Sequence, residues 1–439
     1  MSSTALTPIL VLWTGYPAGA NIVRSLRRAG FPVVGAHPAG APGGRSARCP
    51  LPLRYPPPTA EPARFLGAVA RICRERRIAA IVPVDEDIVR LLAERGDEVP
   101  GPVVVGPDAH QYRTLCDKRA LAETAHALGL DVPATIEVGP DGPDGPWPAL
   151  PSIVKPRTSR SEVARPRMVA TAGERDAYIE ELVAGGHSAI VQERIVGPRW
   201  VVQSVRAPGV FEHVPLRVHE EWPRGAGLAS IKRADPPPEG LAAAARRLLD
   251  HVDYRGPSGI SFIVRDGRLY PHDVNLRLGA TTGASMHAGL DFPRRAVEAV
   301  LGLDGEPFGG RPRRGAYMRL DLELDALFDA RAHRRAGGAP WPILRRAAAV
   351  GLSPSGRLDP SPLNPFWVGP LAAHAAHRAA RAPSGRARAA LAPRDRAPLG
   401  APSHAGGPAI GNDGPQGGPE IYGGQHGDRN HDPRASVRR

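Results

Sequence analysis

Residues 259–277 read GISFIVRDGRLYPHDVNLR, and this stretch decides the fold prediction. An Asp-Gly pair separates two runs rich in apolar residues, which predicts a β-hairpin. Asp273 and Asn275 are two positions apart, so both side chains are expected on one face of the second strand. Arg277 continues that face. Such a row is either the polar outer face of a strand or part of a functional site.

The basic residues carry a second signal, because only three of the 57 are lysines. A chain this rich in Ala, Arg, Gly and Pro is typical of a coding bias that replaces lysine with arginine. A lysine that remains is expected where a compact ammonium is needed and a planar guanidinium does not serve. The three are Lys118 in a predicted helix over 112–128, Lys155 at the end of a predicted strand, and Lys232, which is either a site residue or part of a solvated loop.

Residues 1–110 alternate predicted strands and helices, which is typical of a parallel sheet with helices on its faces. The first strand is followed by Gly15 and Gly19, whose spacing does not match the GxGxxG fingerprint of dinucleotide-binding folds. A tight turn is expected there, and a Rossmann-type dehydrogenase is kept only as the third functional hypothesis. Asp85 follows another predicted strand and has two interpretations, a helix N-cap or a ligand contact at the carboxyl edge of the sheet.

Residues 111–304 mix helices with antiparallel strands, so the chain as a whole is expected to combine α/β with α+β architecture. Residues 305–382 carry further helix and strand patterns and are expected to pack on this core as a C-terminal extension. Residues 383–439 are rich in Pro, Gly, Arg and His without periodicity, which predicts a disordered tail.

Composition argues against several classes of protein. The net charge of +13 suggests nucleic acid, but the aromatic share is 5% and no helix-turn-helix, RNP-like or zinc-finger spacing occurs, so no nucleic-acid partner is expected. Cys49, Cys73 and Cys116 are too far apart for a disulfide framework, which favours a reducing compartment. No apolar run reaches the roughly 18–20 residues of a membrane span, and no signal pattern is seen. A cytoplasmic protein without membrane contact is expected.

Four segments resemble motifs of the ATP-grasp superfamily, in its branch of carbamoyl-phosphate-synthetase-like carboxylate-amine ligases. Each is weak alone, but they occur together in the family's order. They are LCDK at 115–118 with LGLDVP at 128–133, SIVKP at 152–156, IVQERIVG at 190–197 and YPHDVNLR at 270–277. The resemblance implies a pre-ATP-grasp Rossmann-like domain over 1–110, followed by a two-lobed ATP-grasp domain over 111–304.

The resemblance also implies a nucleotide site. ATP is expected to place its phosphates between the ammonium groups of Lys118 and Lys155, which supply positive charge from opposite sides. The adenine edge is expected at the backbone of one short segment, which consists of Gln192, Glu193, Arg194 and Ile195.

A metal ion and two catalytic residues are implied by the same family. Mg²⁺ is expected on Asp273 and Asn275, because carboxylate and amide oxygens are hard ligands that suit an ion bridging phosphates. Arg277 is expected to steady an acyl phosphate or tetrahedral intermediate. Lys232 is expected to be a third phosphate contact.

The implied activity is an ATP-dependent ligase that joins a small-molecule carboxylate to an amine through an acyl phosphate and releases ADP and phosphate. The family is often dimeric, which leaves a homodimer open. Ser261 stands where the family usually has a second carboxylate, and Arg199 stands where it usually has a glutamate. The loop over 157–167 lacks glycine, whereas Gly225-Ala226-Gly227 resembles the family's acceptor-site loop. The departures favour an alternative, an ATP-binding relative with weakened catalysis.

Overall fold

The computed structural model describes residues 7–359, except 16, 40–48, 50, 140–141, 160–165, 223–226, 306, 309–310 and 333–340. These residues all belong to one compact unit, which spans residues 1–381. The predicted tail over 383–439 lies outside the described residues, as do Gly225 and Ala226 of the predicted acceptor-site loop.

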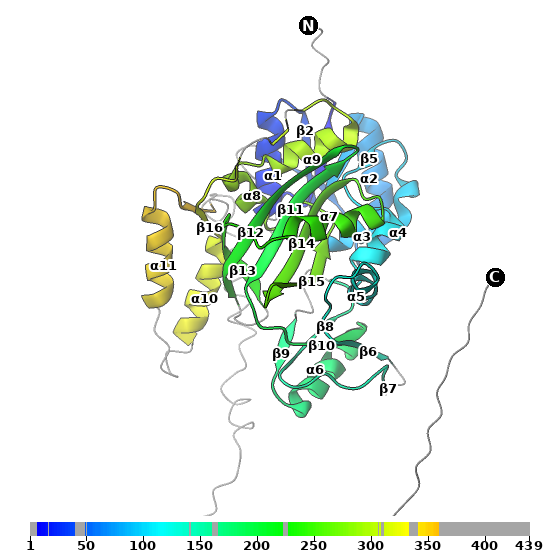
Figure 1. The fold of residues 1–439 in the computed structure, drawn as a ribbon. Coiled ribbons are helices and arrows are strands. Elements are labelled where there is room, and N and C mark those ends of the chain that lie inside the picture. The colour runs from blue at the N-terminus through cyan, green and yellow to red at the C-terminus, as the bar shows by residue number, and fades with distance from the viewer. Residues whose placement is uncertain are drawn as a thin grey trace, which may run out of the picture. The chain divides into compact units, whose positions relative to one another are not determined.

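A parallel five-stranded sheet forms the N-terminal part, as the alternating pattern predicts (Figure 1). Its order is β3-β2-β1-β4-β5, with β1 at Ile9–Leu12, β2 at Val33–Pro38, β3 at Leu53–Tyr55, β4 at Ala80–Pro83 and β5 at Val103–Val104. Helices cover both faces: α1 (Pro17–Arg28) and α9 (Phe292–Leu301) on one, α2 (Pro62–Arg76) and α3 (Glu86–Arg95) on the other.

The central strand β1 shows why these residues form such a sheet. All four of its side chains are fully buried. Ile9 and Val11 belong to the core with α1 and α9, whereas Leu10 and Leu12 belong to the core with α2 and α3. A parallel sheet that is buried on both faces requires a continuous apolar strand of this kind.

The tight turn predicted after β1 is present. Gly19 lies in α1, and a Cβ at this position would lie only 2.5 Å from the Trp13 carbonyl oxygen. Glycine is therefore required so that α1 can pack closely on the end of β1.

The long helix predicted over 112–128 is wrong, because the chain breaks into two helices. α4 spans Ala109–Leu115 and α5 spans Lys118–Ala127. Asp117 is the N-cap of α5, where its side chain accepts hydrogen bonds from the backbone amides of Arg119 and Ala120. This break places Lys118 at the first position of a helix rather than in the middle of one.

A second, smaller sheet has the order β7-β6-β10-β8-β9 and packs against one helix, α6 (Ala172–Ala184). We call this unit the small lobe. Its strands are β6 (Thr135–Gly139), β7 (Gly142–Pro143), β8 (Ser152–Pro156), β9 (Arg167–Val169) and β10 (Ala189–Glu193). Lys155 lies on β8 opposite Ile190 of β10, so the neighbouring central strand fixes its position.

The third sheet is the largest, with the order β15-β14-β11-β12-β13-β16-β17. Its strands are β11 (Arg199–Ala207), β12 (Val210–Trp222), β13 (Leu228–Arg233), β14 (Gly256–Arg265), β15 (Arg268–Asn275), β16 (Ala316–Met318) and β17 (Arg357–Leu358). β14 and β15 form the predicted hairpin. Strands β16 and β17 come from the region beyond residue 304 and extend this sheet next to β13.

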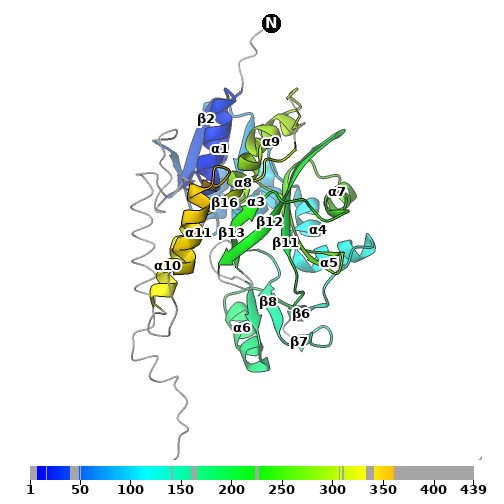
Figure 2. The ribbon, with the colours of Figure 1, turned by 60° about the vertical axis from the view of Figure 1, so that its left-hand side comes forward.

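The large sheet has two different faces. One is apolar and packs against α4, α5 and α7 (Leu241–His251), through Trp200, Val202, Ile260, Phe262, Val274 and Leu276. Figure 2 shows α5 and α7 on this side of the sheet. Because side chains alternate along a strand, the residues between these six face the opposite way, and that face carries the site described below.

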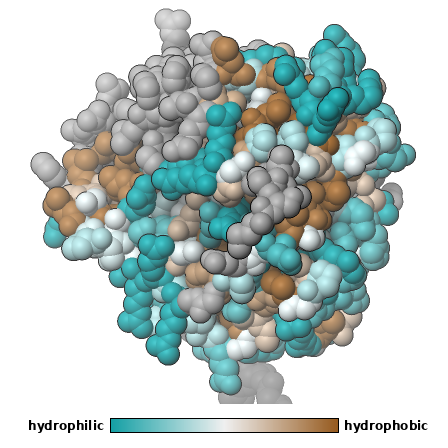
Figure 3. Space-filling view, turned by 90° about the horizontal axis from the view of Figure 1, so that it is seen from above, coloured by the Kyte–Doolittle hydropathy of each residue, from teal (hydrophilic) through white to brown (hydrophobic). Residues whose placement is uncertain are grey.

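The remaining helices are α8 (Thr282–Ala288), α10 (Leu320–Ala332) and α11 (Trp341–Leu352). No helix among the described residues is both long and apolar enough to cross a membrane. The face of the molecule seen from above mixes hydrophilic residues with small hydrophobic patches (Figure 3).

Candidate active site

A cavity of about 490 Å³ lies between the small lobe and the large sheet. It is lined from β8 and β10 on one side, and from β11, β13, β14 and β15 on the other. The end of β4 and the start of α3 also reach it, through Val84, Asp85 and Glu86. All ten residues that the sequence predicts as site residues line this one cavity.

Two lysines project into the cavity from the small-lobe side. Lys118, at the start of α5, is 5% exposed, and its Nζ donates to Ser159 Oγ at 2.9 Å. Lys155 is 3% exposed, and its Nζ donates to the backbone oxygen of His272 at 3.0 Å. The Lys155 ammonium thus reaches β15 of the large sheet, the Lys118 ammonium is held at Ser159, and both charges lie at the same cavity.

An ion pair ties the elements that carry these lysines together. Arg157 Nε donates to Asp117 Oδ2 at 2.7 Å, and the backbone amide of Lys118 donates to the Arg157 oxygen at 3.1 Å. Arg157 directly follows β8, and Asp117 caps α5. The contact therefore fixes the start of α5 against the small lobe, in addition to the N-cap.

A β-bulge in β15 provides the acceptor for Lys155. Asp273 pairs with Ser261 and Pro271 pairs with Phe262, so His272 is an extra residue in the ladder. An extra residue in a bulge leaves the regular ladder pairing. Here the His272 carbonyl accepts from Lys155 instead, and this contact joins the large sheet to the small lobe.

The electrostatics of the cavity are dominated by basic groups. Burial, reinforced by the nearby charge of Lys118, lowers the pKa of Lys155 to about 7. Burial, with Arg319 and Arg199 nearby, likewise lowers the pKa of Lys232 to about 7. With these pKa values, about half of the Lys155 and Lys232 side chains are neutral near pH 7. A bound anion would favour their charged form.

Asp273 is the acidic group at the centre of this basic cluster. Burial acts to raise its pKa, but Lys118, His272 and Lys155 outweigh that effect and lower the pKa overall. Asn275 Nδ2 donates to Asp273 Oδ2 at 2.8 Å, as expected for two side chains on the same face of a strand. Ser261 lies opposite Asp273 on β14.

These residues fit a magnesium ion that phosphates help to hold. Among the described residues, no group of three or more Asp, Glu, His or Cys side chains could hold a metal by itself. Mg²⁺ in nucleotide sites often needs only one or two carboxylates, because phosphates and water complete its shell. The Asp273 carboxylate can supply one such ligand, and Ser261 lies opposite it on β14. The Asn275 amide turns its nitrogen to Asp273 and its oxygen to Arg277, so its oxygen can join the set only if the amide turns over.

The segment predicted to meet adenine borders the same cavity. Gln192 Nε2 donates to Thr135 Oγ1 at 2.7 Å, and the backbone amide of Glu193 donates to the Ala134 oxygen at 2.8 Å. The strand ends at Glu193, and Arg194 and Ile195 continue along the cavity outside regular structure. The segment therefore borders the cavity on the small-lobe side.

Lys232 lies in β13, so the alternative of a solvated loop is wrong. Its side chain is buried, and its Nζ donates to the Ala229 oxygen at 3.0 Å. Arg199, which faces the same cavity, pairs with Glu221 and also donates to the Gly227 oxygen at 3.2 Å. Arg199 is thus held in place by partners on β12 and beside β13.

Arg277 is held by contacts where the cavity borders the N-terminal part. Its Nε donates to Glu86 Oε2 at 2.7 Å, Nη1 to the Val84 oxygen at 3.2 Å, and Nη2 to Asn275 Oδ1 at 3.3 Å. Glu86 is buried, and it belongs to α3 of the N-terminal part. The neighbouring Asp85 is the N-cap of α3 and accepts from the Asp87 amide at 2.9 Å, which supports the capping interpretation.

Several polar residues of the cavity were not predicted, among them Gln203 and Arg319. Gln203 lies on β11 two and four positions from Val201 and Arg199, and all three face the cavity. Gln203 could have been predicted from the alternation of side chains along this strand, which puts it on the same face as Arg199. For Arg319 the sequence held no such signal, because its place depends on contacts between distant elements. Glu86 lies beside Asp85, in the segment that the sequence placed at the carboxyl edge of the parallel sheet.

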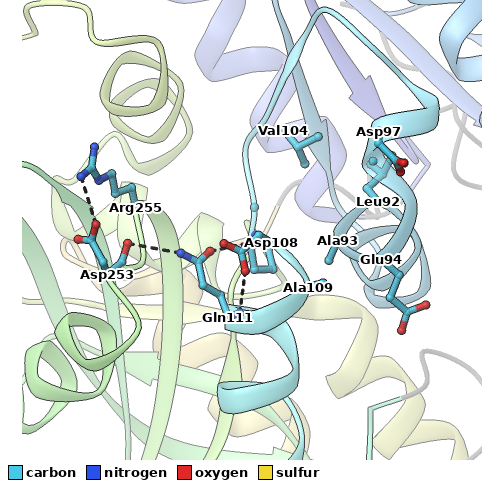
Figure 4. Close-up of a pocket in the computed structure, with 13 residues that line it drawn as sticks. Leu92, Ala93, Glu94, Asp97, Val104, Asp108, Ala109, Gln111, Asp253 and Arg255 are labelled. Atoms are coloured by element: carbon cyan, nitrogen blue, oxygen red, sulfur yellow. Dashed lines mark hydrogen bonds and ion pairs between the residues drawn. The ribbon is translucent and has the colours of Figure 1, made fainter.

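A second depression of about 680 Å³ lies where α3 and the residues after β5 meet the turn before β14 (Figure 4). Its polar groups pair with one another on the surface. Asp108 accepts from the Gln111 amide at 2.8 Å, Gln111 Nε2 donates to the Val252 oxygen at 3.2 Å, and Arg255 pairs with Asp253 at 3.2 Å. These contacts are those of a helix cap and a surface ion pair, so the cavity between the sheets is the better candidate.

No family model and no curated protein matches the sequence. Several solved structures do resemble the chain. L-amino acid ligase from Bacillus licheniformis has 14% identity and a TM-score of 0.56 over 68% of this chain and 75% of the ligase. Biotin carboxylase from Campylobacter jejuni has 16% identity and a TM-score of 0.56 over 71% of this chain and 74% of the carboxylase.

A third similar structure is N5-carboxyaminoimidazole ribonucleotide synthetase from Thermus thermophilus. It has 17% identity and a TM-score of 0.54 over 70% of this chain and 82% of the synthetase. Each of these three similarities extends over about 70% of this chain and concerns the fold. The chain therefore has the ATP-grasp fold.

Proposed function

We propose that this protein is an ATP-dependent ligase that joins a carboxylate to an amine through an acyl phosphate. The observation that carries the proposal is the facing arrangement of Lys118 and Lys155 against Asp273 and Asn275 across one cavity. Such a site can bind a polyphosphate with its charge balanced from both sides. The names of the structurally similar proteins, which include a ligase and a synthetase, support the same class of reaction.

In the proposed reaction, a carboxylate oxygen attacks the γ-phosphorus of ATP and ADP leaves. The amine nitrogen then attacks the acyl carbon, phosphate leaves with the bonding electrons, and the nitrogen loses a proton. Lys118, Lys155 and Lys232 would offset the negative charge of the phosphates, since catalysis of phosphoryl transfer is largely positioning and electrostatics. Arg277 would bind the acyl phosphate. A magnesium ion bound to Asp273 and Asn275 would supply further charge neutralisation between the phosphates.

The first experiment is a nucleotide-dependent thermal shift with ATP, ADP and GTP, followed by a phosphate-release screen over pairs of carboxylates and amines. We expect stabilisation by ATP and phosphate release with some of the pairs. Failure of ATP to bind would contradict the proposal. ATP binding without turnover on a broad panel would favour the alternative, a nucleotide-binding relative with weakened catalysis, to which the serine opposite Asp273 points.

Nucleotide binding is expected to take up protons above neutral pH. The pKa of Lys155 and that of Lys232 are both lowered to about 7, so both side chains are mostly neutral at about pH 8. Bound phosphates favour the ammonium form and raise both pKa values. The affinity for ATP is thus fully present below the lysine pKa of the nucleotide-free protein. It declines as the pH rises through the higher lysine pKa of the nucleotide-bound protein.

Titration calorimetry at about pH 8 in two buffers of different ionisation enthalpy measures this uptake, which we expect to approach one proton per lysine. The variant Lys155→Met, which cannot be protonated, is expected to take up fewer protons than the wild type. Equal heats in the two buffers would contradict the prediction.

A further inference from the structure

Arg157 connects the two elements that carry Lys118 and Lys155, although it does not itself line the cavity. It lies two residues beyond Lys155, directly after β8. Its backbone amide donates to the Ser188 oxygen, beside β10, at 2.9 Å, and its carbonyl accepts from the Lys118 amide at 3.1 Å. The backbone of one residue thus joins the central strand of the small lobe to the start of α5.

The Arg157 side chain makes the same connection a second time. Nε donates to Asp117 Oδ2 at 2.7 Å, and Nη1 donates to both carboxylate oxygens of Glu137, on β6, at 2.8 Å. Isolated ion pairs at a surface contribute little, but a planar guanidinium held by two acids in a partly buried network is directional and stronger. The side chain therefore fixes how α5 meets the small lobe.

The same contacts leave the Lys118 ammonium available to a ligand. Asp117 directly precedes Lys118, and a carboxylate so close would otherwise compete for the ammonium. Its Oδ1 is used by the N-cap hydrogen bonds of α5, and its Oδ2 accepts from Arg157, whose charge offsets that of the carboxylate. Lys118 Nζ donates instead to a neutral partner, Ser159 Oγ.

Lys118 and Lys155 lie close enough to repel each other. After burial, the charge of Lys118 is the largest cause of the lowered pKa of Lys155. Two such groups tend to move apart unless the elements that carry them are held together, and Arg157 is the residue that joins these elements. Groups that are already in place bind a ligand more tightly, because less freedom is lost on binding.

We propose that Arg157 is a positioning residue for the nucleotide, which holds Lys118 and Lys155 at the separation at which both contact the phosphates of ATP. This inference rests on the proposed function, because it takes the cavity as the ATP site, and deepens it. The effect should concern the phosphates rather than the base. The predicted adenine segment is anchored by its own hydrogen bonds to Ala134 and Thr135.

The test compares the affinities of the full-length protein for ATP, by titration calorimetry with magnesium, and for adenosine, by ligand-observed NMR titration. Arg157→Met keeps most of the side-chain length and removes the guanidinium. We expect it to weaken ATP binding by about tenfold or more and to leave adenosine binding within about twofold of the wild type. Arg157→Lys retains the charge without the planar fork and is expected to be intermediate.

A double-mutant cycle tests whether the effect runs through Asp117. Asp117→Asn keeps an N-cap side chain but weakens the contact with Arg157. Because both changes act on one contact, we expect the double variant to lose less ATP affinity than the sum of the two single losses. This cycle decides the question if adenosine binds too weakly to be measured.

Arg167→Met is the matched control. Arg167 pairs with both oxygens of Glu181 at 2.8 and 2.9 Å within the small lobe, and it does not line the cavity. The same substitution there removes an ion pair of the same kind, so we expect the affinity for ATP to stay unchanged. Thermal melts establish that each variant is folded, and Arg157→Lys takes the place of Arg157→Met if the latter does not fold.

The outcomes separate this inference from the proposed function. A selective loss of ATP affinity in Arg157→Met supports the inference even if no pair of acid and amine releases phosphate, in which case the ligase proposal fails. If the folded Arg157 variants bind ATP as tightly as the wild type, the inference is overturned and the ligase proposal stands. A parallel loss of ATP and adenosine affinity, or additive losses in the cycle, also overturns it. Absence of ATP binding by the wild type overturns both.

Discussion

Replacement of Lys155 by arginine is expected to abolish nucleotide binding while leaving the protein folded. The ammonium is 3% exposed and reaches the His272 oxygen at 3.0 Å, so the surrounding space is shaped for a compact group. The guanidinium of arginine is longer and planar, and it stays charged at every pH that proteins experience. Lys155, by contrast, can lose its proton near neutral pH, because its pKa is about 7. Loss of charge-assisted contacts worth roughly 3 kcal/mol would weaken ATP binding about a hundredfold.

Titration calorimetry with ATP measures the effect, and circular dichroism establishes that the variant is folded. Arg217→Lys is a suitable control, because Arg217 is exposed on the same large sheet and does not line the cavity. Arg217→Lys also exchanges arginine and lysine, but away from the cavity, so we expect it to leave ATP binding unchanged. If Lys155→Arg bound ATP as tightly as the wild type, the phosphates would have to lie elsewhere.

Asp273→Asn is expected to have opposite effects on ATP binding with and without magnesium. With Mg²⁺, the loss of the one carboxylate in the proposed ligand set should weaken binding by about tenfold or more, since carboxylates are the preferred hard ligands. Without Mg²⁺, removal of a negative charge beside the phosphates should leave binding equal or tighter. A general disruption of the fold would weaken binding in both conditions.

Ser261→Asp is the complementary change. Ser261 lies opposite Asp273, so a carboxylate there would restore the charge that the family usually has at this position. We expect tighter magnesium-dependent ATP binding or faster turnover. Asp266→Asn, in the 85%-exposed turn of the same hairpin, is the control and should be silent. If both Ser261→Asp and Asp273→Asn were silent as well, the hairpin would not be at the metal.

The fold class could be predicted because local patterns carry it. The hairpin of β14 and β15 was predicted from its Asp-Gly turn, and its apolar residues Ile260, Phe262, Val274 and Leu276 do share one buried face. The parallel sheet followed from the alternation of apolar strands and helices. The ATP-grasp fold, suggested by the four motifs, is confirmed by the similar solved structures.

What could not be predicted depends on tertiary contacts. The break at Asp117 was missed because the residues on both sides favour a helix, and only the pairing with Arg157 and the N-cap hydrogen bonds make two helices better than one. The sequence left a solvated loop open for Lys232, because the pairing of β13 with β12 and β16 joins segments that are distant in the sequence. The roles of the site residues stay predictions until the variants are measured.

Because the large sheet has a core face and a cavity face, it limits where residues can be inserted or deleted. Each strand over the cavity alternates core and cavity residues, so a one-residue insertion in β14 would turn Ile260 and Phe262 out of the core and Ser261 into it. Folding and ligand binding would fail together, and insertions or deletions are tolerable only in the turns. The bulge at His272 is the exception, because deletion of that residue would still leave Asp273 opposite Ser261, although the carbonyl that holds Lys155 and the His272 side chain in the cavity would be lost.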